Sequence, residues 1–330
     1  MPHGTGGSDF SSEADNMGEQ RTLGSVAYDT KGKVTRRERF LTEMDAVIPW
    51  TRLLALVAPH YAVAGRGRRP LPLETMLRVY FLQQWFDLSD PHAEDMLYDS
   101  ESMRRFARVE LGDDTVPDES TILRFRHLLE QHQLTAQMFA AIRGLLEEKR
   151  LLLKAGTIVD ATIIAAPSST KNATGTRDPA MRQTRKGNQW YFGMKIHVGT
   201  DTRGIVHSLV TTDAAQADIT QLPALVHGQE TTLYGDKAYY KADDKAHWEA
   251  SGGAYRVNKS GKRSAKWDAI NAARSRVRAR VEHPFHVVKR LWGFTKGRYR
   301  GLLKNTVRAY AAFALANLYR LRHRLAPQGT

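Results

Sequence analysis

The chain has 330 residues, 42% of them apolar, which is enough for one large folded domain or two ordinary ones. It contains no cysteine, so disulfide bonds, thiolate catalysis and cysteine-based zinc sites are excluded, and no apolar run is long enough to span a bilayer. With a formal charge of +14 and no signal-peptide pattern, the sequence predicts a cytoplasmic protein that binds a polyanion.

The first 150 residues predict helices that follow a polar start. Residues 1–33 have few large apolar side chains and no periodicity, which indicates a disordered leader. Apolar residues then recur at helical spacing, so residues 34–150 are expected to form an all-helical region. The expected helices cover residues 36–60, 73–86, 92–109, 121–134 and 135–150, with Ser120 or Thr121 as the cap of the fourth.

From residue 151 the pattern changes to strands that alternate with helices. The run "AGTIVDATII" at 155–164 is rich in β-branched residues, which suits a buried strand, and residues 191–198 and 205–212 predict a hairpin. The polar residues 166–190 predict a loop. Further strands are expected at 231–236 and 254–257, and helices at 218–228, 241–250, 267–292 and 306–325. This order indicates a mixed α/β sheet.

Positive charge is concentrated near the C-terminus. Residues 255–330 carry nineteen Lys and Arg side chains against Asp268 and Glu282, a balance of +17, whereas residues 1–30 have a balance of −4. Counterion release makes such a basic surface an effective nucleic-acid binder. A surface whose charge serves only solubility would rarely concentrate charge of one sign so strongly, so we expect a nucleic acid as partner.

Three acids occupy positions that suit metal-dependent chemistry. Asp160 interrupts an apolar strand, where an unpaired carboxylate would be costly to bury. Asp236 ends another strand, and Glu282 is almost the only acid on a basic helix. Hard divalent cations prefer carboxylate oxygens, and a pair of such ions stabilises both oxygens of a phosphoryl displacement. Each acid alone also fits an ordinary turn, cap or ion pair, so only their convergence in the fold would indicate a site.

The helix that carries Glu282 places cations beside it. Arg278, Glu282 and Lys289 are spaced i, i+4 and i+11, which puts them on one helix face, and Pro284 is expected to bend the helix just after Glu282. An acid flanked by cations suits a site that holds phosphate oxygens. A basic helix with one intrahelical ion pair is the alternative.

Three blocks of sequence carry a family resemblance. "IVDATII", "YGDKAYY" and "RARVEHPFHVVKRLWG" resemble the three acid-bearing blocks of the DDE transposases of bacterial insertion sequences, most closely those of the IS5 family. Residues 187–198 and 117–130 also resemble segments of that family, so the resemblance covers about residues 40–325. One departure is Ser275, which stands where the related signature has Tyr.

The resemblance implies a fold and an activity. It implies an RNase H-like mixed-sheet catalytic domain at residues 151–330, after a helical region at 34–150 that binds DNA or dimerises. It implies cleavage and strand transfer of double-stranded DNA at terminal inverted repeats, with Asp160, Asp236 and Glu282 as catalytic acids and metal ligands. We expect two Mg²⁺ ions, for which Mn²⁺ can substitute. We also expect a homodimer or higher oligomer on target DNA. The expected location is the bacterial cytoplasm, at the nucleoid, with no membrane partner.

Six basic residues are candidates for DNA contact. They are Arg278, Lys289, Arg290, Lys195, Arg124 and Arg126. The first two belong to the Glu-bearing block of the family. Arg124 and Arg126 lie on a capped helix that could enter a major groove or sit on phosphates, although a bundle helix with a charged outer face fits equally. Lys195 shares a strand face with His197, and a solvated lysine is as good an interpretation.

Other polar and aromatic residues allow two interpretations. Asp218 and Gln221 have capping-box spacing, and Asp213 is expected to shape the loop after its strand. His197 and His207 lack a second ligand at metal spacing, which favours packing or phosphate contact. The aromatic residues could stack on a flipped base or fill the core; they are Trp190, Tyr191, Tyr239, Tyr240 and Trp292. Rival functions are a nuclease that cuts without joining and a DNA-binding protein that has lost catalysis.

Overall fold

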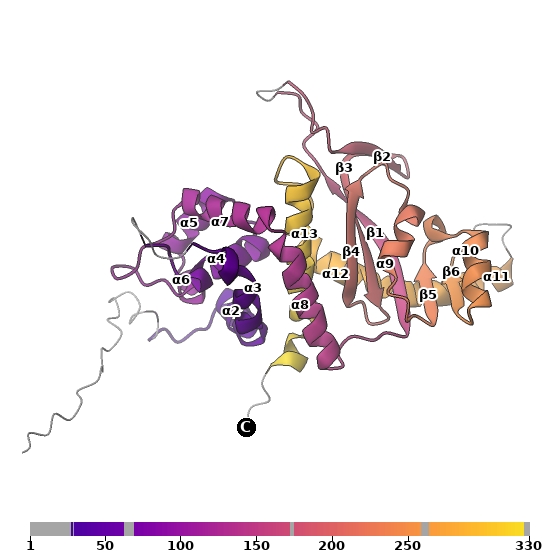
Figure 1. Ribbon diagram of the computed structural model, residues 1–330, viewed down its shortest axis with the longest axis horizontal. Helices are drawn as coiled ribbons and strands as arrows, with labels where there is room; N and C mark the ends of the chain where they lie inside the picture. The colour runs from indigo at the N-terminus through magenta and orange to yellow at the C-terminus, as the bar shows by residue number, and fades with distance from the viewer. Residues whose placement is uncertain (1–27, 29, 63–68, 172–174, 259–263, 327–330) are drawn as a thin grey trace, which may run out of the picture.

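The computed structural model describes residues 28, 30–62, 69–171, 175–258 and 264–326, so nearly all of the expected leader at 1–33 lies outside the described residues. The N-terminal helices and the sheet stand on opposite sides of two central helices, α8 (Leu134–Glu148) and α13 (Leu302–Leu325), as Figure 1 shows. Among the described residues, no helix is both long and apolar enough to cross a membrane.

The elements described between residues 34 and 150 are helical, as the sequence predicts for that region. The helices before α8 are α2 (Arg36–Val47), α3 (Trp50–Val57), η1 (Ala58–His60), α4 (Leu73–Phe86), α5 (Asp90–Asp99), α6 (Glu101–Ala107) and α7 (Glu119–Gln131). Two local expectations are wrong. The helix expected at 92–109 is two helices, because Ser100 between them is extended, with φ −115° and ψ 102°. The N-cap of α7 is Asp118, whose carboxylate accepts from Thr121 N at 2.7 Å.

The sheet has six strands. They are β1 (Gly156–Ala165), β2 (Arg182–Lys186), β3 (Gln189–Asp201), β4 (Val206–Asp213), β5 (Thr232–Gly235) and β6 (Ala254–Val257). Strand β3 lies antiparallel to β1, β2 and β4, and β5 and β6 lie parallel to β1, which gives the order β2-β3-β1-β5-β6 with β4 also paired to β3. This is the RNase H-like arrangement that was expected. Strand β2 forms inside the expected loop, because its backbone pairs with β3 without an apolar pattern.

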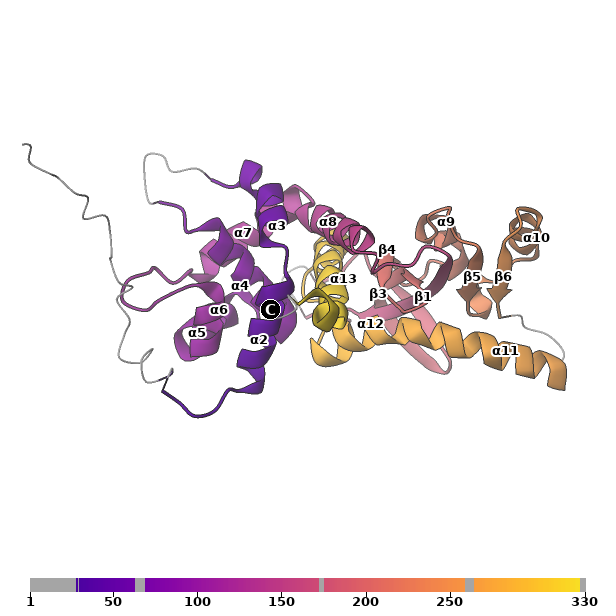
Figure 2. The same cartoon turned by 90° about the horizontal axis from the view of Figure 1, so that it is seen from below.

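The long basic helix expected at 267–292 forms as one continuous helical stretch from 265 to 291, along which the hydrogen-bond pattern changes. It consists of α11 (Ala265–Arg278), a 3-10 turn η4 (Ala279–Val281), α12 (Glu282–His286) and a π-helical segment η5 (Val287–Leu291). The 3-10 turn before Glu282 includes the buried Val281, and the π-helical segment begins three residues after Pro284, which was expected to bend the helix. Figure 2 shows α11 and α12 along one face of the sheet.

The opposite face of the sheet is covered by smaller elements. These are η2 (Asp218–Gln221), α9 (Leu222–Leu225), η3 (Lys237–Tyr239) and α10 (Ala242–Ala250). Each face of the sheet packs against its own apolar cluster. Ile158 belongs to the larger cluster, which includes residues of the N-terminal helices and α13. The next residue, Val159, belongs to the smaller cluster, which includes residues of α9. Side chains alternate along a strand, so even-numbered β1 residues, Asp160 among them, face α11 and α12.

The helical region is attached to the sheet through α13. Buried Asn317 on this helix accepts a hydrogen bond from Val206 N at 2.9 Å and donates one to Val206 O at 2.7 Å. Both backbone groups of Val206, the first residue of β4, are therefore hydrogen-bonded to α13. The other side of α13 packs against α8, α2, α4 and α7. The C-terminal helix thus lies between the strands that precede it and the helices that begin the chain.

Candidate active site

Asp160 lies in the middle of β1, on the face toward α11. Its side chain is 14% exposed, and its two oxygens have different partners. Oδ1 accepts from Ala161 N at 2.8 Å, and Oδ2 accepts from Arg278 Nη1 at 3.0 Å. Burial raises the pKa of Asp160 to about 6, and the negative charges of Asp236 and Glu282 add to this rise, whereas Ala161 N–H and Arg278 oppose it.

Asp236 follows β5 at the same level of the sheet. The parallel register pairs Ile158 of β1 with Tyr234 of β5, so two more residues along each strand lead to Asp160 and Asp236. Neighbouring strands lie roughly 4.8 Å apart, which makes these two carboxylates close neighbours. Asp236 also caps η3, with Oδ1 accepting from Ala238 N at 2.8 Å, so its side chain has a fixed direction.

Glu282 comes to the same place from the helical layer. It is the first residue of α12, it is exposed, and the 3-10 turn η4 joins it directly to the end of α11. Its charge acts on Asp160, as does that of Asp236. The strand register thus brings Asp236 next to Asp160, and Glu282 lies one helical turn after Arg278, the side chain that bonds to Asp160.

A basic cavity of about 540 Å³ adjoins Glu282. Lys289, Arg290 and Lys186 line it, together with Tyr191 and Thr162. Lys289 Nζ donates to Thr162 Oγ1 at 3.0 Å and to Ile163 O at 3.1 Å, so this ammonium is fixed at the edge of β1. Burial lowers the pKa of Lys289, and the charges of Lys186 and Arg290 lower it further.

The two arginines of α7 have different environments. Arg126 is buried, and its guanidinium contacts Asp90 at 2.9 Å and Glu130 at 2.7 Å and stacks over Tyr299. The prediction that Arg126 contacts DNA is therefore wrong for this arrangement, because its donors already hold the helical region together. Arg124 is exposed and lines a separate cavity of about 500 Å³ near the start of α7.

Lys195 also has an internal partner. Its Nζ donates to Asp218 Oδ1 at 2.8 Å and to Gln216 O at 2.7 Å, and the side chain is 13% exposed. The structure thus gives Lys195 the role of joining β3 to the segment after β4 instead of a DNA-facing position. Asp218 forms this ion pair and does not cap its helix, contrary to expectation. Asp213 does shape the loop after β4, since its Oδ1 accepts from Ala215 N at 2.8 Å.

The candidate histidines and aromatic residues differ in burial and in the groups they contact. His197 is buried, and its Nε2 lies 2.9 Å from Thr212 Oγ1. Tyr239 and Trp292 are core residues, whereas Trp190 is 65% exposed on the β2–β3 hairpin. The sequence analysis found no second ligand at metal spacing for His207, but the fold brings possible ligands to it. His227 and Glu230 lie beside it, and their H-x-x-E spacing in the sequence was the available signal.

Comparisons with known proteins cover both halves of the chain. Residues 152–318, just over half of the chain, match the family model described as "Transposase DDE domain", and residues 28–128 match "Transposase domain (DUF772)". Among solved structures, the chain is similar to "Crystal structure of the Mos1 Strand Transfer Complex", with 12% identity, coverage of 89% of this chain and 96% of that chain, and a TM-score of 0.28. On the family match, the chain belongs to the DDE transposases.

Proposed function

We propose that Asp160, Asp236 and Glu282 are the catalytic acids and metal ligands of this DDE transposase. Enzymes of this family cleave and join DNA with divalent metal ions, so the chain must carry a set of oxygen ligands. The observation that supports the assignment is the parallel register of β1 and β5, which puts Asp160 and Asp236 at the same level of neighbouring strands. Carboxylates on neighbouring strands repel one another, and a bound cation would relieve that repulsion.

The donor chemistry fits magnesium. All three side chains offer carboxylate oxygens, which are the ligands that hard divalent cations prefer. We assign two Mg²⁺ ions to the site, with Mn²⁺ as an effective substitute. Such ions, when bound, supply charge stabilisation for the attacking and the leaving oxygen of a phosphodiester.

The neighbouring residues of the chain position the acids and the substrate. Ala161 N–H and Ala238 N–H each fix one oxygen of an aspartate, and Arg278 holds the second oxygen of Asp160. Lys289 and Arg290 lie on the wall of the cavity beside Glu282, where their charges would hold phosphates of the DNA end. We assign this cavity to the backbone of the cleaved strand.

We further propose that the DNA ends are terminal inverted repeats of an insertion sequence of the IS5 type. The helical region at 34–150 would bind these ends or join two copies of the chain, and residues 151–330 would form the catalytic domain. Exposed Arg124, beside a cavity that Arg69 also lines, is the candidate phosphate contact of the helical region. A homodimer or higher oligomer would then hold two ends together.

The test is cleavage and joining on labelled DNA that carries the presumed ends, with Mg²⁺ or Mn²⁺. The variants Asp160→Asn, Asp236→Asn and Glu282→Gln should each reduce cleavage by at least about 10³-fold and keep DNA binding. Glu249→Gln, an exposed acid on α10, is the matched control and should cut normally. Cleavage that survives Glu282→Gln would show that the third acid is wrong. Cleavage without joining of pre-cut ends would indicate a nuclease.

A further inference from the structure

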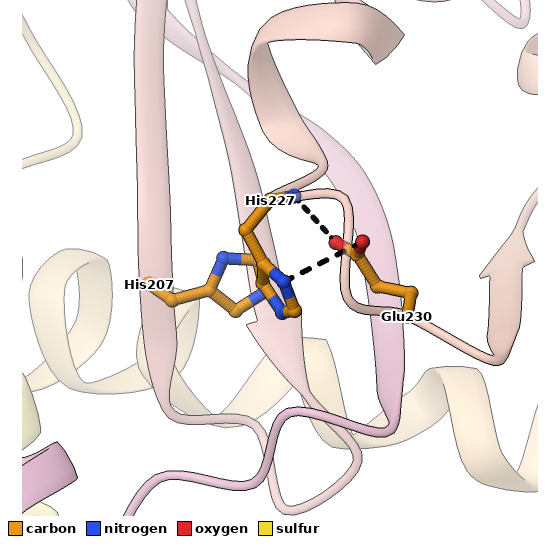
Figure 3. Close-up of side chains that lie close together, drawn as sticks. All are labelled: His207, His227 and Glu230. Carbon is orange, nitrogen blue, oxygen red and sulfur yellow. Dashed lines mark hydrogen bonds and ion pairs between the residues drawn. The ribbon is translucent and has the colours of Figure 1, made fainter.

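A second cluster of titratable side chains lies away from the three acids. His207 is on β4, and His227 and Glu230 are in the loop between α9 and β5 (Figure 3). One ring nitrogen of each histidine and one oxygen of Glu230 lie within 4.8 Å of one another. Thr157, which bonds to the cluster, is three residues before Asp160 on β1, so the two side chains point to opposite faces of the sheet.

We infer that His207, His227 and Glu230 form a binding site for a tetrahedral transition-metal ion, with zinc as the best match. Two imidazoles and one carboxylate are a donor set that zinc uses when its fourth position is left open. Magnesium prefers oxygen ligands and octahedral geometry, so this cluster and the three acids would take different metals.

The carboxylate of Glu230 is held as an ionised ligand. Its side chain is fully buried, and it accepts three hydrogen bonds. Oε1 accepts from Thr157 Oγ1 at 3.0 Å and from His227 N at 2.6 Å, and Oε2 accepts from Gly228 N at 2.7 Å. Nδ1 of His227 lies 3.5 Å from Oε2 and is a countercharge only when protonated, so with neutral His227 a cation bound by the two imidazoles would supply the missing charge.

His207 has the partner that a metal-binding histidine needs. Its Nδ1 lies 2.9 Å from Ser208 Oγ, and its Nε2 lies 3.1 Å from Thr157 Oγ1. The metal-binding tautomer carries hydrogen on Nδ1 and donates it to Ser208, as metal-bound histidines commonly do. The one hydroxyl hydrogen of Thr157 then goes to Glu230, so Nε2 keeps a lone pair toward the cluster.

The fourth position of the site has access to solvent. His207 and His227 line a cavity of about 160 Å³, together with Arg143, Lys154 and Glu147. The two cations in this wall would repel a metal ion, but Glu147 lies 3.7 Å from Arg143 Nε and 3.4 Å from Lys154 Nζ and offsets part of their charge. The cavity can therefore admit an ion and leave room for a water ligand.

Gly199 allows the two halves of the cluster to approach. A Cβ at this position would lie 2.3 Å from Leu225 O and 2.9 Å from the Cε1 of His207, closer than carbon atoms tolerate. The missing side chain lets the ring of His207 lie under the chain that leads to His227. A bound metal would fasten this loop to β4, and the loop leads directly into β5 and Asp236.

The experiment measures zinc and cobalt bound to the full chain, purified without a histidine tag. Wild type should bind one Zn²⁺ per chain, and Co²⁺ should give the intense visible absorption of a tetrahedral site. His227→Gln and Glu230→Gln should weaken binding by about tenfold or more, while Ser208→Ala should weaken it by about 10- to 100-fold through the orientation of His207. His247→Gln, an exposed histidine on α10, is the matched control and should bind normally.

A variant that lacks the three proposed catalytic acids distinguishes zinc binding at the histidine cluster from metal binding at those acids. The combined variant Asp160→Asn, Asp236→Asn, Glu282→Gln should keep its one Zn²⁺, which is expected whether or not the catalytic assignment is correct. Circular dichroism checks that each variant is folded. Unchanged zinc affinity in folded His227→Gln, loss of zinc in the triple variant, or no binding by wild type at micromolar zinc would each overturn the inference.

Discussion

Arg278 Nη1 lies 3.0 Å from Oδ2 of Asp160, across 118 residues of sequence, and so joins α11 to the central strand of the sheet. The arginine side chain is 27% exposed and the aspartate side chain 14%. In the absence of a metal ion, this guanidinium is the cation nearest to the buried carboxylate. Arg278 therefore both positions Asp160 and competes with any ion that Asp160 would bind.

Arg278→Gln should strengthen metal binding at the three acids. Removal of the competing charge should lower the Mn²⁺ dissociation constant of the DNA-free protein by about fivefold, which corresponds to about 1 kcal/mol for a partly exposed pair. Electron paramagnetic resonance of free Mn²⁺ measures this constant. Arg276→Gln, at an exposed position of α11, is the control and should leave it unchanged. Weaker Mn²⁺ binding in Arg278→Gln would mean that the arginine supports the site instead of competing for it.

Arg126→Met should destabilise the protein strongly. The substitution leaves Asp90 and the buried Glu130 without their shared cation, and the loss of one partner from a buried ion pair costs about 3–5 kcal/mol. Denaturant unfolding measures the change. Arg124→Met, two residues earlier and exposed, should cost about 0.5 kcal/mol or less. Equal effects of the two substitutions would contradict the structural role of Arg126.

The buried His197 should make stability depend on pH. Burial lowers its pKa from 6.5 to about 4, so between these values the unfolded chain binds a proton that the folded protein resists. Stability from this residue is therefore present above pH 6.5 and is lost as the pH falls toward 4. From pH 7 to pH 5, wild type should lose up to about 2 kcal/mol relative to His197→Gln. Unfolding free energies of both proteins at the two pH values measure this difference, and parallel losses would refute it.

Some features follow from the order of residues alone. The run of β-branched residues around Asp160 predicts a buried strand. A carboxylate within such a strand is costly to bury, which marks Asp160 as a candidate functional residue. The apolar spacing of residues 73–86 predicts α4 with its bounds, since helical periodicity is a local property. The basic segment after residue 255 and the three family blocks likewise indicate DNA chemistry before any fold is known.

Other features depend on neighbours that are distant in sequence. Arg124 and Arg126 look alike in the sequence, but two residues turn a helix by about 200°, and the surrounding helices decide which arginine is buried. Strand β2 has no apolar pattern, so only its backbone pairing with β3 defines it.

The sequence by itself determined the class of chemistry, because residue type and local periodicity carry the acids, the charge and most of the elements. Tertiary structure alone decided which polar groups meet. It put Asp236 next to Asp160 through the strand register, paired Arg278 with the Asp160 carboxylate, and brought His207 to His227 from another element. The physical reason is that burial and long-range pairing set the partners of a charged side chain, and neither can be read from its sequence neighbours.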